Sequence, residues 1–365
     1  MSGTTTRKMI RMYNQQAAPT SFMAGLFQSP KGNMHNSAEV EIDVVRGQED
    51  VSIAIQDLSV GYRANANDIY SNKSFVPPIH KESIALNSHD LIKRTPGQDS
   101  FEDPDFRGNV IARAFMGAKK VERKIRRAME LQASQVMQTG TVTLTDSAGV
   151  SVYAIDYKPK ATHLPDAGVA WASATGKQMM GDIDALADVI RGNGLADANQ
   201  LIFGDTAFQN FINAAQVQAL YDNRRIVIGT VPPMEMRGGG GKYRGTIEIG
   251  NYSYDMWTYN GRYTHPQTGV STPFMTPTKV IVRVAEGRLD ASFGAIPNIG
   301  AELGIGSGRL LRELPSRISN TDGGMDMSIN VWLTENGEQL FVGVGSRPLM
   351  IPTAIDTFGC IDTAP

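Results

Sequence analysis

One long helical pattern constrains the fold of this sequence more than any other feature. Asp103 is a favourable N-cap residue, Pro104 fits the first helical turn, and Gly140 after Thr139 suits the position that follows a helix C-terminus. The positions spaced by three or four along this pattern are Phe106, Val110, Ala114, Ala118, Val121, Ile125, Ala128, Gln132 and Val136. A helix of about 34 residues is roughly 50 Å long, well above the usual length in globular proteins.

The first two thirds of this predicted helix are strongly basic. Eight bases stand against one acid, Glu122. They are Arg107, Arg113, Lys119, Lys120, Arg123, Lys124, Arg126 and Arg127. Such a run is typical of a solvated helix face, and it also fits a basic surface that meets a polyanion or an acidic neighbouring subunit. The whole chain shows no such excess, because its 35 Lys and Arg residues face 37 Asp and Glu residues, for a formal net charge of −2.

The first 40 residues are rich in Ser, Thr, Asn, Gln, Gly and Met, which predicts an extended arm. One short apolar patch interrupts it, from Phe22 to Phe27. The patch is either a small docking knob on a frayed terminus or a segment that lies on a neighbouring subunit, because an isolated apolar patch needs a surface to cover it.

A long hairpin is predicted after the arm. Residues 39–62 alternate as strands do, with Val40, Ile42 and Val44 on one face. A polar stretch from Ala64 to Ser74 follows, and a second extended run from Ile79 to Ile92 is predicted to close the hairpin. A two-stranded hairpin alone is marginal in water, so we expect it to lie on another surface.

The second half of the chain alternates strands with helices, which predicts a mixed domain of both. The predicted elements are strands within 141–157, a helix around 183–190, a strand at 200–204, a helix after Asp205, strands at 246–249, 252–259 and 279–284, and final strands at 331–333, 340–344 and 349–351. The run from Gly238 to Lys242 lacks the spacing of a phosphate-binding loop, which predicts a flexible loop tip.

The search for chemistry finds no catalytic, cofactor or metal site. No two of the five histidines are spaced for a metal on one helix face. Cys360 is the only cysteine, which excludes a disulfide framework within the chain and favours a small core residue over a nucleophile. No apolar run approaches 18 residues and the N-terminus lacks a signal-peptide core, so we expect no membrane partner and a protein made in a cytoplasm. An arm, an unsupported hairpin and an over-long helix all expose surface, and this combination predicts a protein that functions by assembling.

The order of these elements resembles the lambda-like major capsid protein E family, within the tailed-phage and herpesvirus-type capsid fold. Four pieces of sequence carry the likeness: the patch Phe22–Phe27, the run from Ile92 to Arg107 that enters the long helix, Asn223-Arg224-Arg225, and the segment from Pro348 to Cys360. The resemblance implies an α+β fold with an N-terminal arm at 1–46, an extension hairpin (E-loop) at 47–95, a peripheral P-domain at 96–165 with return strands at 326–365, and an axial A-domain at 166–325.

The resemblance also implies the function and partners. We expect the major capsid protein of a tailed bacteriophage, forming hexamers and pentamers of an icosahedral shell that encloses double-stranded DNA without sequence-specific binding. A scaffold, a portal and a decoration protein are the implied partners, with no cofactor, and the location is the virion, after assembly in the host cytoplasm. The candidate subunit-interface residues are Phe22, Leu26, Phe27, Phe75, Lys73 and Lys81. A Lys–Asn crosslink is not predicted, because nothing in the sequence indicates a matching Asn or catalytic acid.

Two other classes stay open at this point. A nucleic-acid-binding protein would use the basic helix over residues 107–127, and its affinity would fall steeply with salt. An α/β enzyme would assemble its site from residues distant in sequence, and a metal or cofactor would purify with it.

Overall fold

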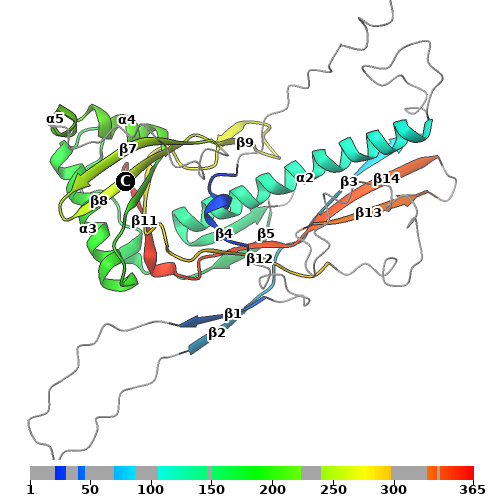
Figure 1. Cartoon of the computed structure of the whole chain (residues 1–365), viewed down its shortest axis with the longest axis horizontal. Coiled ribbons are helices and arrows are strands. Elements are labelled where there is room, and N and C mark those ends of the chain that lie inside the picture. Colours follow the sequence, from blue (N-terminus) through cyan, green and yellow to red (C-terminus); the bar gives the residue numbers. More distant parts are fainter. Residues whose placement is uncertain are drawn as a thin grey trace, which may run out of the picture.

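The computed structural model describes residues 21–29, 40–45, 70–87, 106–145, 150–222, 240–296, 327–334 and 338–365. An α/β body lies at one end of the molecule, and helix α2 (Phe106–Thr139) runs from this body to the far end (Figure 1). A small sheet accompanies the far half of α2, and the β1–β2 hairpin projects away from both (Figure 1).

Helix α2 confirms the central prediction, with 34 residues in one unbroken element. Its end is the predicted one. Gly140 has a φ of +66°, its amide donates to the carbonyl of Val136 at 2.8 Å, and a Cβ at this position would lie 2.4 Å from Cγ of Pro159. Both the left-handed backbone and the close approach of the proline require glycine here.

A three-stranded antiparallel sheet lies under the N-terminal half of α2. Its strand order is β13 (Ser328–Leu333), β14 (Gln339–Ser346) and β3 (His80–Asn87). Alternate side chains of all three strands pack against one face of α2 in a shared core. The helix contributes Ala114, Ala118, Val121 and Ile125, and the sheet contributes Ile84, Leu86, Val331, Leu340, Val342 and Val344 among others.

The projecting hairpin differs from the predicted one. Strand β1 (Val40–Val45) pairs antiparallel with β2 (Tyr70–Phe75), which lies at the end of the stretch that we predicted as a polar turn. The run from Ile79 to Ile92 does contain a strand, but this strand is β3, whose partner is β14 more than 250 residues later. The prediction that it closes the hairpin is therefore wrong. Strand alternation shows that a segment is extended, but it does not identify the strand with which the segment pairs.

The body is built on a five-stranded sheet with the order β16 (Phe358–Asp362), β11 (Lys279–Arg283), β6 (Gln200–Phe203), β8 (Tyr252–Tyr259) and β7 (Gly241–Ile249). Only the β6–β8 pair is parallel. Helices α3 (Gly176–Gly194), α4 (Asp205–Asn213) and α5 (Ala215–Asp222) share a core with one face of this sheet. The C-terminal third of α2 shares a second core with the other face. The sheet is therefore sandwiched, as the neighbouring residues Leu201 and Ile202 illustrate by entering different cores.

Smaller elements complete the described chain. They are the hairpin of β4 (Thr141–Thr145) and β5 (Ser151–Asp156), the pair β9 (Arg262–Thr264) and β10 (Ser271–Pro273), the pair β12 (Asp290–Phe293) and β15 (Pro348–Ile351), and the 3-10 turns η2 (Ala24–Leu26), η4 (Ala161–His163) and η7 (Ile355–Thr357). The sequence analysis did not predict β9, β10, β12 or β16. Helix α3 begins earlier than predicted, at a capping box between Thr175 and Gln178. No helix in the described ranges is long and apolar enough to cross a membrane.

Candidate functional site: the arm dock

The described part of the N-terminal arm, residues 21–29, is held by one buried carboxylate on α2. Glu130 is 0% exposed. Its Oε1 accepts hydrogen bonds from the amide of Met23 at 2.8 Å and from the Tyr259 hydroxyl at 2.6 Å, and its Oε2 accepts one from the amide of Ala24 at 2.8 Å. The carboxylate thus pairs the first amides of turn η2, which have no partner within the turn itself. We call Phe22–Phe27, Glu130, Gly241, Trp257 and Tyr259 together the arm dock.

Burial raises the pKa of Glu130, and the hydrogen bonds from Tyr259 and from the arm backbone partly offset this rise. These three donors are neutral groups, so dipoles stabilise the carboxylate in place of a cation. A buried ionised group is expensive unless it is paired or fully hydrogen-bonded. The arm therefore completes the solvation of Glu130, while Glu130 fixes the position of the arm.

Aromatic rings form the apolar wall of the arm dock. The Phe22 ring stacks on Tyr259 at 5.1 Å between centroids and lies 6.0 Å from the Trp257 ring. Gly241 makes room for it, because a Cβ there would lie 2.2 Å from the Phe22 ring. Gly241 and Lys242 begin strand β7, so this end of the glycine run is not the predicted flexible loop tip. Because Gly241 has no side chain, the Phe22 ring fits beside it, from a segment more than 200 residues away in the sequence.

The arm continues past the dock to an isolated β-bridge. The Gln28 amide donates to the Leu289 carbonyl at 2.8 Å, and the Ala291 amide donates to the Gln28 carbonyl at 2.8 Å. Gln28 thus forms a parallel bridge with Asp290 beside β12. Turn η2 and this bridge together fix residues 21–29 on two separate parts of the fold.

Three of the six predicted interface residues lie in the arm dock. Phe22, Leu26 and Phe27 are all buried in the same core as α2. The structure therefore gives them a role inside the subunit, in agreement with the docking-knob alternative, because Trp257, Tyr259 and Gly241 provide the apolar surface within the same chain. Their role at a subunit interface stays a prediction.

The other three candidates lie around the base of the hairpin. Phe75 is half-buried at the end of β2, with its ring 5.4 Å from that of Tyr157. Lys73 lies within β2 opposite Ile42 of β1, and Lys81 is exposed on β3 opposite Gly345. Phe75 packs against the same core as the arm patch, and the interface role of all three residues also stays a prediction.

The C-terminal third of α2 holds further buried polar groups that periodicity does not reveal. Ser134 Oγ and Gln138 Nε2 both donate to the Phe274 carbonyl, at 2.6 and 3.0 Å, and the Thr276 amide donates to Gln138 Oε1 at 2.9 Å. These bonds tie the helix to the segment after β10. One signal in the sequence marks this region: the basic residues stop at Arg127, and the rest of the helix has no Lys or Arg.

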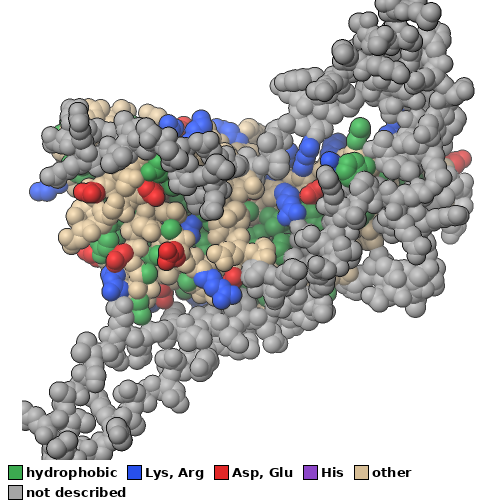
Figure 2. Space-filling model, viewed as in Figure 1, with side chains coloured by type: hydrophobic (Ala, Val, Ile, Leu, Met, Phe, Trp, Pro, Cys, Tyr) green, Lys and Arg blue, Asp and Glu red, His purple; other side chains and the backbone are tan. Residues whose placement is uncertain are grey.

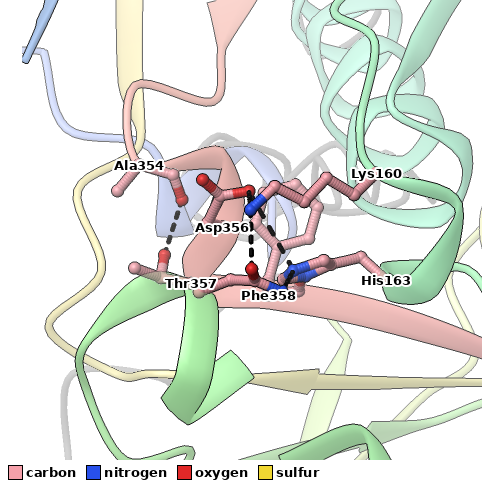
Figure 3. Close-up of polar contacts among 7 residues, drawn as sticks. Lys160, His163, Ala354, Asp356, Thr357 and Phe358 are labelled. Carbon is pink, nitrogen blue, oxygen red and sulfur yellow. Dashed lines mark hydrogen bonds and ion pairs between the residues drawn. The ribbon is translucent and has the colours of Figure 1, made fainter. Parts of the chain in front are cut away.

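A second polar cluster, around the buried His163, links η4, the end of α3 and the C-terminal strand (Figure 3). The His163 ring is buried, with Nδ1 2.8 Å from the Phe358 carbonyl and Nε2 3.2 Å from the Asn193 side-chain amide. Lys160 Nζ donates to Asn193 Oδ1 at 2.6 Å and lies 3.8 Å from Asp356. Every group here contacts other protein groups, so the cluster serves as a structural junction of the body.

The described residues offer no group of His, Cys, Asp or Glu suited to a metal ion. Cys360 is buried in β16, and burial raises the pKa of its thiol to about 12. The thiol therefore stays protonated at neutral pH, as expected of a core residue and not of a nucleophile. His35, His89 and the Gly304–Gly308 run lie outside the described residues.

Comparison with known proteins gives one family and one fold. The family model described as "Phage major capsid protein E" matches residues 5–359. A crystal structure described as the capsid protein of a prophage from E. coli CFT073 superposes with a TM-score of 0.58 at 16% identity, over 80% of this chain and 79% of that chain. The capsid of Ralstonia phage GP4 gives a TM-score of 0.49 at 12% identity, over 97% of this chain and 91% of that chain. Among curated proteins, none matches.

Proposed function

Because this chain belongs to the phage major capsid protein E family, we propose that it assembles as hexamers and pentamers around packaged double-stranded DNA. The protein is a phage major capsid protein, a non-enzymatic structural component of the virion that self-assembles into the icosahedral head. The family match over residues 5–359 is the observation that carries this function, and the shared α+β capsid fold agrees with it.

We also propose a division into subdomains that follows the strand pairings. The five-stranded body with α3, α4 and α5 corresponds to the A-domain, and α2 with the β13–β14–β3 sheet corresponds to the P-domain. This proposed division differs from the expected one at three boundaries. Strand β1 joins the hairpin and not the arm, β3 joins the P-domain sheet, and β16 joins the A-domain sheet although it lies in the predicted return segment.

Exposed apolar side chains support assembly through the peripheral parts of the subunit. Val76 and Ile79 lie between the hairpin and β3, and both are exposed. Trp332 is 44% exposed on the P-domain sheet, where its ring stacks on Phe341 at 5.3 Å. Large apolar groups at the surface of a subunit are typical of contacts that form on association. Many such contacts made at once give a stable shell even when each contact is weak.

Size and shape of the purified protein test this proposal. We expect light scattering to give a species far above the 39.6 kDa of one chain, and electron microscopy to show closed shells or rings with six-fold symmetry. If the protein stays a monomer alone, co-expression with the neighbouring phage genes supplies the scaffold, portal and decoration proteins that we propose as partners. Monomers under both conditions would contradict the proposal.

A further inference from the structure

The N-terminal half of α2 carries a basic surface. Lys119, Lys120, Arg123, Arg126 and Arg127 follow one another at helical spacing, and we call them the basic stripe. The stripe covers about 12 Å of the helix axis. Figure 2 shows Lys and Arg side chains gathered along this part of the molecule.

The stripe lies on the side of α2 that faces away from the sheet. Ala118, Val121 and Ile125 alternate with it in sequence and are buried against β13, β14 and β3. At 100° per residue, Arg123 lies opposite the centre of this buried face, with the other four bases on either side of it. Residues three or four apart on a helix are about 5–6 Å apart at Cβ, so the five charges form a continuous positive surface.

Among the described residues, few acids neutralise the stripe. Glu122 lies 3.8 Å from Arg126, and Lys119 lies over the Phe115 ring at 4.4 Å. Within the described ranges, Lys120, Arg123 and Arg127 have no ion-pair partner. Repulsion among these charges opposes folding slightly, so a partner that supplies negative charge would be favoured.

Among the possible partners, the phosphate backbone of duplex DNA fits best. Duplex DNA carries one negative charge per ~1.7 Å of its axis, which matches a dense linear row of bases. The alternative is an acidic surface on a second copy of this chain, such as that of Asp182, Asp184 and Asp188 on α3. Contacts to phosphates carry no sequence information, so binding through them is independent of sequence.

We propose that the basic stripe of α2 binds the phosphates of the packaged DNA and that this face of the subunit therefore faces the interior of the shell. This inference rests on the proposed capsid function. The two-layer arrangement of α2 on its sheet then places the far face of the sheet, with Trp332 and Phe341, away from the DNA. The formal net charge of −2 means that such binding comes from the local stripe and not from the chain as a whole.

Fluorescence anisotropy of a short labelled duplex, measured with the unassembled full-length protein against NaCl concentration, tests the contact. The test variant is Lys120→Gln/Arg123→Gln/Arg127→Gln, in which glutamine keeps the helix propensity. The matched control is Lys158→Gln/Lys177→Gln/Lys242→Gln, which removes the same charge from exposed bases of the body. Loss of three phosphate contacts lowers the slope of log affinity against log salt by about 2.7. Raising NaCl from 50 to 200 mM should therefore weaken binding by the variant by a factor roughly 40 times smaller than for the wild type.

The outcomes separate this contact from the alternatives. A lower salt slope in the test variant with an unchanged slope in the control supports the proposal. Equal decreases of the slope in both variants would show a bulk charge effect and overturn it. Stronger binding of polyglutamate than of duplex would overturn it in favour of an acidic protein partner. Closed shells that bind added long duplex as tightly as free subunits would overturn the interior placement. Shell formation, scored separately by electron microscopy, reports on the capsid function itself, so the two proposals fail independently.

Discussion

The two halves of helix α2 lie in different environments. The N-terminal half, from Arg113 to Arg127, buries one face on a three-stranded sheet and presents bases on the other. In the C-terminal part, from Met129 to Gln138, eight of ten residues are buried, and the helix is enclosed by the body sheet, the arm and the segment after β10.

One helix therefore belongs to the core in its C-terminal part and to the surface along one face of its N-terminal half. The C-terminal part buries Glu130, Ser134 and Gln138 only because hydrogen-bond partners from distant segments reach them. In the N-terminal half, from Arg113 to Arg127, no polar side chain is buried in this way. The C-terminal part therefore anchors α2 in the subunit, while the N-terminal half remains available to other molecules.

The largest expected effect is a loss of stability when a buried methionine of this helix is truncated, and an exposed methionine of the same helix is the control. Met137 is fully buried and Met116 is 54% exposed. Met137→Ala should lower the free energy of unfolding of the unassembled subunit by about 3 kcal/mol, because it leaves a cavity in the core. Met116→Ala is the control and should change it by less than about 0.5 kcal/mol. Urea unfolding followed by circular dichroism measures both, and equal losses would contradict the contrast between the two halves.

Removal of the Glu130 carboxylate should have a smaller effect. Glu130→Ala leaves two arm amides and the Tyr259 hydroxyl without their acceptor, and we expect a loss of about 2 kcal/mol in the free energy of unfolding. The loss is limited because the arm can leave the dock and its amides can bond to water. Hydrogen exchange checks this directly: the amides of Met23 and Ala24 should exchange much faster in the variant. Unchanged protection of these amides would contradict the role of Glu130 as the arm anchor.

The pH dependence of stability should show the smallest effect. The folded-state pKa of Glu130 is raised above its usual 4.5, so the folded protein binds this proton more tightly than the unfolded chain does. Its contribution to stability is therefore fully present below about pH 4.5 and declines as pH rises through the folded-state pKa. Wild-type protein should lose stability relative to Glu130→Gln over this range in urea unfolding series. A constant difference between the two proteins would show that the arm hydrogen bonds cancel the effect of burial on the pKa of Glu130, and a wild-type gain would show that they outweigh it.

Local elements were predictable where the signal lies in neighbouring residues. The start of α2 at Asp103 and Pro104 lies outside the described residues, but its length, its end at Gly140 and its buried face at Ala114, Ala118 and Val121 follow from spacing and from glycine chemistry. The strands at 200–203, 252–259 and 340–344 were also predictable. Their alternation and apolar runs depend on the sequence alone.

Strand partners and the arm dock were not predictable from the sequence. The alternation in Ile79–Ile92 indicated a strand, but β14 competes with β2 as its partner, and nothing local decides between them. Likewise, Glu130 has the spacing of a solvent-facing residue, and Gly241 appeared to belong to a loop. Their roles become visible only when Phe22 and Met23 lie beside them.

The sequence by itself determined the helix, the extended segments, the absence of a recognisable catalytic motif and the resemblance to a capsid family. Only the tertiary structure decided which strands pair, that the arm patch has a surface within its own subunit, and that the polar residues at the C-terminal end of α2 are buried. The physical reason is that propensity and periodicity act over a few residues. Burial of a carboxylate or an aromatic ring depends on partners that chain folding brings from more than 100 positions away.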